Sequence, residues 1–197
     1  YETRYADCIT GSGNAASDVG CFRSAGAWNY ADEMCFTFGW GMSYTDFEQQ
    51  ITGVEYDAET DQYMVNVEVR NIGEKPGKCA VLVYAQTPYG EYERLNEVEK
   101  SAIQFVGYEK SSLLDPDGTE TVQVPVDRYL LASYDQNGAE GYILSAGDYY
   151  FAVGESSHDA LNNILAVQGY VGMFNQDGTE DVTLNESCVY KFTDGIP

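Results

Sequence analysis

Residues 62–70 read Gln-Tyr-Met-Val-Asn-Val-Glu-Val-Arg, and this stretch indicates the fold class more directly than any other. Apolar and polar side chains alternate along it, with Tyr63, Val65, Val67 and Val69 on one side. Because successive side chains of a β-strand point to opposite faces of a sheet, this period of two predicts a strand with one buried face. The same alternation returns in residues 119–126.

The rest of the pattern consists of short strands separated by turn residues. Residues 78–86 are almost continuously apolar, which is typical of a central strand. Further strands are expected at 101–108, 142–144, 148–153 and 188–192, and a short helical turn capped by Asp159 at 159–165. Turns are expected at 71–77, 115–118 and 137–138. With no sustained helical period, the pattern predicts an all-β, fibronectin type III or immunoglobulin-like β-sandwich.

Composition restricts the partners. The 197 residues carry a net charge of −22, which repels the phosphates of nucleic acid and of anionic membranes. The five cysteines are widely spaced and form no CxxC pair, so no zinc site or other cofactor is expected. Cys79 is expected to be a small buried residue, and whether Cys8 and Cys21 pair is left open.

A family resemblance rests on residues 35–48, which read Cys-Phe-Thr-Phe-Gly-Trp-Gly-Met-Ser-Tyr-Thr-Asp-Phe-Glu. This segment resembles the signature that joins the α/β sandwich domain of family-3 glycoside hydrolases to their fibronectin type III-like domain. Thr37 departs from it, since proline is usual there. Other segments resemble the family in the family's order, at 1–5 before the motif and at 69–77, 83–84, 105–110, 131–135 and 146–154 after it.

The resemblance implies a division of the chain into three parts. Residues 1–45 form an irregular arm and an interdomain joint, 46–165 the sandwich, and 166–197 a C-terminal extension or tether. Tyr1-Glu2-Thr3-Arg4 reads as the interior of a longer protein. The joint residues are aromatic and glycine: Phe36, Phe38, Gly39, Trp40, Gly41, Tyr44 and Phe47.

The resemblance also implies a role. The partners are the catalytic barrel and the α/β sandwich domain of a parent enzyme, which resembles the β-glucosidases of carbohydrate metabolism. Those domains hold the catalytic carboxylates, so no catalytic residue is carried over and the chain alone is expected to be inactive. The compartment is left open between the bacterial cytoplasm and secretion with the parent.

Sugar contact is a further expectation, because aromatic side chains in loops stack on sugar rings. The candidates are Trp28, Tyr30, Tyr89 and Tyr92. Two other functions remain as alternatives. One is an independent carbohydrate-binding module; the other is a calcium-stabilised adhesin-like domain, for which Asp115-x-Asp117-Gly118 and Asn175-x-Asp177-Gly178 are partial calcium-loop matches.

Overall fold

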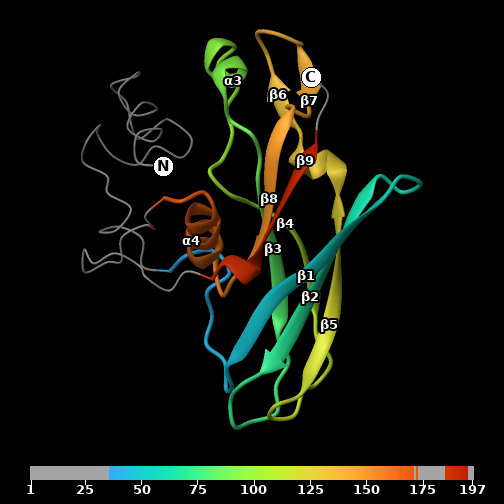
Figure 1. Cartoon of the computed structure of the whole chain (residues 1–197), viewed down its shortest axis with the longest axis vertical. Coiled ribbons are helices and arrows are strands. Elements are labelled where there is room, and N and C mark those ends of the chain that lie inside the picture. The colour runs from blue at the N-terminus through green and yellow to red at the C-terminus, as the bar shows by residue number, and fades with distance from the viewer. Residues whose placement is uncertain (1–35, 171, 173–184, 195–197) are drawn as a thin grey trace, which may run out of the picture.

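The computed structural model describes residues 36–170, 172 and 185–194, and in these it shows two antiparallel sheets packed face to face (Figure 1). The first sheet has the order β1-β2-β5, formed by Phe47–Asp57, Gln62–Asn71 and Thr119–Asp127. The second has the order β4-β3-β8-β9, formed by Gln104–Lys110, Ala80–Gln86, Gly147–Val153 and Val189–Asp194.

Smaller elements complete the domain. The strands β6 (Ser133–Asp135) and β7 (Gly141–Ile143) form a separate hairpin. The helices are α3 (Glu91–Leu95) and α4 (Ser157–Val167), and single 3₁₀ turns occur at Arg128–Leu131 and Glu186–Cys188. None of the helices in the described part of the chain has the length and apolar character needed to cross a membrane.

The main core lies between the two sheets, as the period-two patterns predict. The buried faces of β2 and β5 supply mainly valines, and β3 and β8 supply the opposing side. Its members include Val65, Val67, Val124, Val83 and Phe151, all with no exposed surface. The prediction of an all-β sandwich is confirmed, and so is the burial of Cys79.

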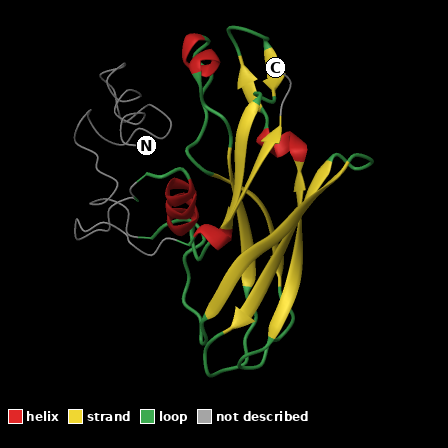
Figure 2. Ribbon diagram, viewed as in Figure 1, coloured by secondary structure: helices red, strands yellow, loops and turns green. Residues whose placement is uncertain are grey.

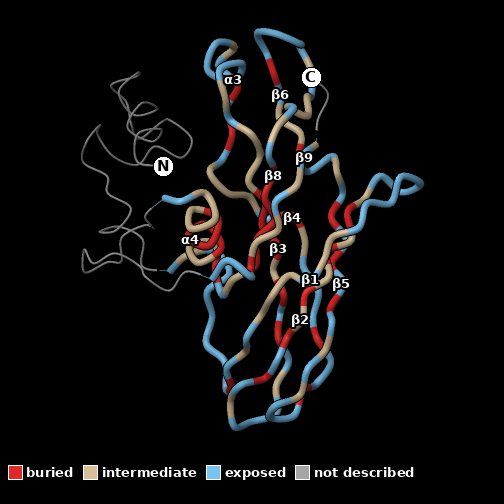
Figure 3. Tube along the Cα trace, viewed as in Figure 1, coloured by how far each residue is buried: buried red, intermediate tan, exposed pale blue. Residues whose placement is uncertain are grey.

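A second, smaller core lies on the outer face of the four-stranded sheet, where α4 covers it (Figure 2). Tyr150 and Ala152 of β8 pack there with Ala160 and Ile164 of α4. Strand β8 is therefore buried on both faces, which Figure 3 shows as buried residues along it. A strand covered twice loses the polar alternation that β2 keeps.

Helix α4 is longer than the expected helical turn and has a different cap. It begins after Ser156, whose Oγ accepts a hydrogen bond from the backbone N–H of Asp159 at 3.4 Å. Asp159 thus lies in the first turn, where its carboxylate accepts a hydrogen bond from Ser156 Oγ at 2.9 Å. The prediction of Asp159 as the cap is wrong because serine, three residues earlier, precedes the helical backbone.

The C-terminal strand β9 extends the sheet, pairing antiparallel with β8. Its last residue, Asp194, accepts two hydrogen bonds from the guanidinium of Arg128, at 2.8 and 2.7 Å. The hydroxyl of Tyr63 donates to the same carboxylate at 2.6 Å. The C-terminal region was expected to be an extension or a tether. Residues 189–194 form an extension, because they add a strand to the sheet.

The turn after β2 is held by one buried side chain. Asn71 has no exposed surface, and its Nδ2 donates to the carbonyl oxygens of Lys75 and Leu114 at 2.7 and 3.0 Å. Its Oδ1 accepts from Thr45 Oγ1 at 2.7 Å and from the N–H of Gly73 at 3.1 Å. This side chain connects the predicted turn to the residues that lead into β1.

We expect Phe151→Ala to lower the free energy of unfolding by about 3–5 kcal/mol, because it removes a fully buried ring and leaves a cavity in the main core. Thr121→Ala, on the exposed face of β5, is the control and should change it by less than about 0.5 kcal/mol. Urea denaturation followed by circular dichroism measures both, and equal effects would contradict the assigned core.

Candidate functional site

The segment that leads into β1 is fixed against the outer face of the second sheet. The carbonyl oxygen of Phe38 accepts hydrogen bonds from the N–H of Ser157 at 2.8 Å and from the hydroxyl of Tyr84 at 3.2 Å. Gly39 has a φ of +91°, and a Cβ there would collide with the Tyr84 hydroxyl and with Leu82. Glycine is therefore required at this position, whereas Gly41 has open space around it.

Most of the aromatic residues in this segment face solvent. Tyr44 is 98% exposed and Phe38 is 61% exposed. Ring centroids lie 4.6 Å apart for Phe36 and Trp40, and 5.4 Å apart for Phe38 and Phe105. The last joint residue, Phe47, instead packs against the main core as the first residue of β1.

We call the exposed aromatic group formed by Phe36, Phe38, Trp40, Phe105 and Tyr108 the joint surface. It combines the segment before β1 with the strand β4, which supplies the last two rings. Its ring contacts form two groups, Phe36 with Trp40, and Phe38 with Phe105 and Tyr108. Exposed aromatic groups of this kind are typical of surfaces that contact another protein domain.

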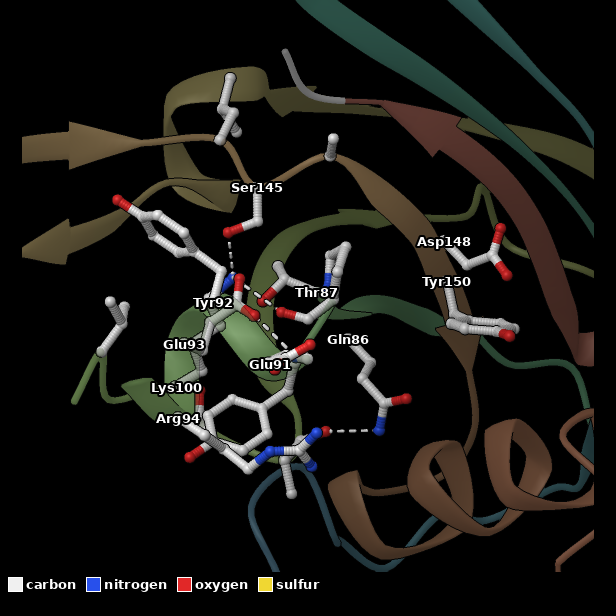
Figure 4. Close-up of a pocket in the computed structure, with 18 of the residues that line it drawn as sticks. Gln86, Thr87, Glu91, Tyr92, Glu93, Arg94, Lys100, Ser145, Asp148 and Tyr150 are labelled. Atoms are coloured by element: carbon white, nitrogen blue, oxygen red, sulfur yellow. Dashed lines mark hydrogen bonds and ion pairs between the residues drawn. The ribbon is translucent and has the colours of Figure 1, made fainter. Parts of the chain in front are cut away.

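A second feature is an open pocket of about 1920 Å³ between the β3–β4 loop and the strands β8 and β9 (Figure 4). Figure 4 shows α3 on one side of it and Asp148 and Tyr150 on the other. Residues from the end of α4 line it as well. Polar and aromatic side chains therefore meet in one open concavity.

The loop wall is held by a buried ion pair. Lys100 Nζ lies 3.2 Å from Glu93 Oε1, and both side chains are buried. Lys100 also donates to the carbonyl oxygen of Pro88 and to Ser145 Oγ, each at 2.7 Å. Glu93 Oε2 accepts from the N–H of Gly90 at 2.6 Å, which caps α3. The pair thus connects α3 to the chain that leads into β8.

The carboxyl group of Glu93 stays ionised over a wide pH range. Burial alone raises its pKa, but hydrogen bonds from Ser145 and from backbone N–H groups, together with the charge of Lys100, lower the pKa to about 2. Glycoside hydrolysis needs one carboxyl group with a raised pKa to act as the general acid. Glu93 does not meet this requirement, and its contacts are those of a residue that positions a loop.

The opposite wall presents polar groups beside an aromatic ring. Lys191 Nζ lies 2.7 Å from Asp148 Oδ2 and 5.8 Å from the centre of the Tyr150 ring. Gln168 at the end of α4 donates to Gln86 Oε1 at 2.6 Å. Amide, ammonium and carboxylate groups next to an aromatic face are the chemistry that recognises polyhydroxylated molecules.

Two of the four residues expected to contact sugar lie at the pocket. Tyr89 lines the pocket and is about half exposed. Tyr92 lines it as well, and its hydroxyl donates to Asp135 Oδ2 at 2.6 Å, which connects α3 to β6. Trp28 and Tyr30 lie outside the described residues.

The first calcium-loop candidate forms an ordinary turn between β4 and β5. The N–H of Gly118 donates to the carbonyl oxygen of Asp115 at 2.8 Å, and Asp117 pairs with Arg70 at 2.7 Å. Within the described ranges, no three His, Cys, Asp or Glu side chains are grouped to hold a metal ion. The candidate at 175–178 lies outside those ranges.

The pocket was not found from the sequence, since its walls come from distant segments. The sequence held one local signal for α3. Gly90 is followed three residues later by Glu93, a spacing that resembles the start of a capped helix. The partner of that glutamate, Lys100, and the contact with Ser145 depend on tertiary structure.

Comparison with known proteins agrees with this architecture. Residues 80–157 match the family model of the fibronectin type III-like domain. A β-glucosidase of Ruminococcus albus is 33% identical over 133 residues, which cover 66% of this chain and 13% of that enzyme. The structure of a β-glucosidase from Paenibacillus barengoltzii matches with a TM-score of 0.54 and 36% identity, over 64% of this chain and 14% of that one.

A third match is β-glucosidase 3B of Thermotoga neapolitana, solved in complex with glucose. It has a TM-score of 0.54 and 30% identity, over 65% of this chain and 17% of that one. The match therefore spans less than a fifth of the length of each of these relatives.

We expect Glu93→Gln to lower the free energy of unfolding by about 3 kcal/mol or more at pH 7, because it leaves the buried Lys100 charge without its counter-charge. Glu91→Gln, exposed on the same helix, is the matched control and should have little effect. Adding Lys100→Met to Glu93→Gln should recover part of the loss, since the unpaired charge is then removed.

The same pair predicts a pH dependence. The folded pKa of Glu93 lies below its usual value of 4.5, so its contribution to stability is present above that pH and is lost as pH falls towards 2. The difference in unfolding free energy between the unmodified chain and Glu93→Gln should therefore narrow from pH 5 to pH 2. A difference that does not change with pH contradicts the assignment.

Proposed function

Because this chain carries a fibronectin type III-like domain of the kind found in the β-glucosidases of glycoside hydrolase family 3, we propose that it is a non-catalytic brace between the catalytic domains of such an enzyme. The chain accounts for a small share of its relatives' length, so most of such an enzyme lies in other domains. The proposed partners are a catalytic barrel and an α/β sandwich domain.

The observation that carries this proposal is the exposed joint surface. Phe36, Phe38 and Trp40 lie on the segment that precedes the sandwich, and each has about half or more of its surface in solvent. Rings exposed in this way gain free energy when a neighbouring domain covers them. Their position supports a contact with the domain that precedes the sandwich in the parent.

A brace must also be rigid, and the backbone of the joint meets this requirement. The carbonyl oxygen of Phe38 is held by Ser157 at the start of α4 and by Tyr84 of β3. Both elements belong to the second core, so a force on the joint is transmitted to the sandwich. The buried side chain of Asn71 holds Thr45 at the other end of the segment.

We expect the double substitution Phe38→Ala with Trp40→Ala to lower the melting temperature of the full-length parent, because truncating central aromatic residues of an interface costs about 2 kcal/mol or more. The melting temperature of this chain alone should change much less. Tyr56→Ala, an exposed tyrosine at the β1–β2 hairpin, is the control.

Calorimetry of the parent and of the isolated chain measures both effects. The isolated chain should also release no product from an aryl β-glucoside. An unchanged melting temperature in the full-length double variant would contradict the brace, and turnover by the isolated chain that one carboxylate substitution abolishes would contradict the non-catalytic role.

A second role is favoured by the pocket, namely that its loop rims the substrate site of the parent. Tyr89 lies on this loop, which the Glu93–Lys100 pair holds in place, and Tyr92 lies on the helix that follows. A rim contact is made to the outer sugar units of a substrate, away from the bond that is cleaved. It therefore affects binding of long substrates more than chemistry.

In the full-length parent, we expect Tyr89→Ala to raise KM for a β-linked glucose oligosaccharide about 3- to 10-fold, the effect of losing one aromatic contact, with little change in kcat. Tyr89→Phe keeps the ring and should retain most of the affinity. Steady-state kinetics with the oligosaccharide and with an aryl β-glucoside distinguish contact with the outer sugar units from contact near the bond that is cleaved. An equal rise in KM for both substrates would exclude a role at the rim.

A further inference from the structure

The hairpin β6–β7 and the 3₁₀ turn before it carry an exposed group of tyrosines. Tyr129, Tyr134 and Tyr142 are 57%, 53% and 63% exposed. Their ring centroids lie 5.2 Å apart for Tyr129 and Tyr142, and 5.4 Å apart for Tyr134 and Tyr142. We call these three residues the tyrosine platform. Figure 1 shows its hairpin at the end of the domain that also carries α3, whereas the joint segment lies beside α4.

The platform has a rigid support on the opposite face of β6. Next to Tyr134, the side chain of Asp135 is buried and accepts hydrogen bonds from three backbone N–H groups, those of Asn137, Gly138 and Ala139, at 3.2, 2.8 and 2.9 Å. The hydroxyl of Tyr92 donates to the same carboxylate. Because neighbouring residues of a strand face opposite ways, fixing Asp135 inward holds Tyr134 outward.

The other two rings are positioned as well. Tyr142 lies directly across the hairpin from Tyr134 in the strand register. The backbone N–H of Tyr129 donates to Asp127 Oδ1 at 2.9 Å, which caps the 3₁₀ turn. A hydrogen bond with Tyr142 raises the pKa of Tyr129, so the Tyr129 phenol stays protonated near neutral pH. A preformed aromatic group loses little conformational entropy when a ligand binds.

The electrostatic surroundings restrict the ligand. Asp127 and Glu140 each lie two residues before a platform tyrosine in the sequence, and the chain carries a net charge of −22. The adjacent cation, Arg128, has its guanidinium engaged by both oxygens of Asp194. An anionic ligand would therefore be repelled, and a phenol-rich surface suits a ligand with apolar C–H faces and neutral hydroxyl groups.

We propose that the tyrosine platform is a binding site for neutral β-linked glucose oligosaccharides, separate from the pocket beside α3. The Tyr142 ring is tilted by 53° against Tyr129 and by 76° against Tyr134, so the three rings enclose a sugar unit instead of forming one flat surface. Ring faces stack against its C–H groups, and the phenol hydroxyls exchange hydrogen bonds with sugar hydroxyls. The choice of glucose units rests on the proposed function, in which this chain is a domain of a β-glucosidase. Such a site would hold substrate on the enzyme outside the pocket.

The test uses the whole 197-residue chain and cellohexaose as the probe. Isothermal calorimetry should show saturable binding at millimolar or lower concentration. Tyr134→Ala and Tyr142→Ala should each weaken it about 5- to 10-fold, the loss of one stacked ring, and the double variant should remove it. Tyr142→Phe keeps the stacking face and should retain most of the affinity. A hexamer of galacturonic acid, which is anionic, should not bind.

The matched control is Tyr56→Ala on the β1–β2 hairpin, which should leave binding unchanged, and Tyr89→Ala tests the pocket as the competing site. Thermal melting of every variant separates lost binding from lost folding. No binding by the unmodified chain, or binding that only Tyr89→Ala removes, would overturn the platform. Neither result bears on the proposed brace function, which is tested by the melting temperature of the full-length parent with an altered joint surface.

Discussion

Burial of β8 on both of its faces is the constraint on which the rest of this structure depends. Phe151 and Val153 point into the core between the sheets, while Tyr150 and Ala152 pack against α4. The strand cannot shift without opening both cores, and its neighbour β9 adds a further ladder of backbone hydrogen bonds. The joint segment and the pocket are both attached to this strand or to an element packed on it.

The joint surface and the pocket are both held by the paired strands β3 and β8. Tyr84 of β3 pairs with Ala152 of β8, and its hydroxyl holds the carbonyl oxygen of Phe38. On the other side, Asp148 and Tyr150 of β8 form a wall of the pocket. The two surfaces therefore have a fixed relation to each other, as a brace that also contacts substrate would need.

Two positively charged side chains, Lys100 and Arg128, stabilise the structure of this acidic chain. Lys100 is buried beside Glu93 and ties the β3–β4 loop to Ser145, and Arg128 holds the end of β9 through Asp194. Because isolated buried charges are costly, both groups are paired and hydrogen-bonded. The exposed aromatic residues are thereby mounted on ordered backbone, which lowers the entropic cost of contact with a domain or a sugar.

The sequence by itself determined the strand faces of β2 and β5 and the turn at Asn71, because these depend on neighbouring residues and on a period of two. It also predicted an apolar central strand at residues 78–86, where β3 lies, although not the double burial of β8, the cap of α4 at Ser156 or the existence of α3. Tertiary structure alone decided that β9 pairs with β8, that Glu93 meets Lys100 and Ser145, and that Tyr129, Tyr134 and Tyr142 form one surface. These contacts depend on how loops return the chain to the sheets, and a local pattern carries no information about which distant residues then become neighbours.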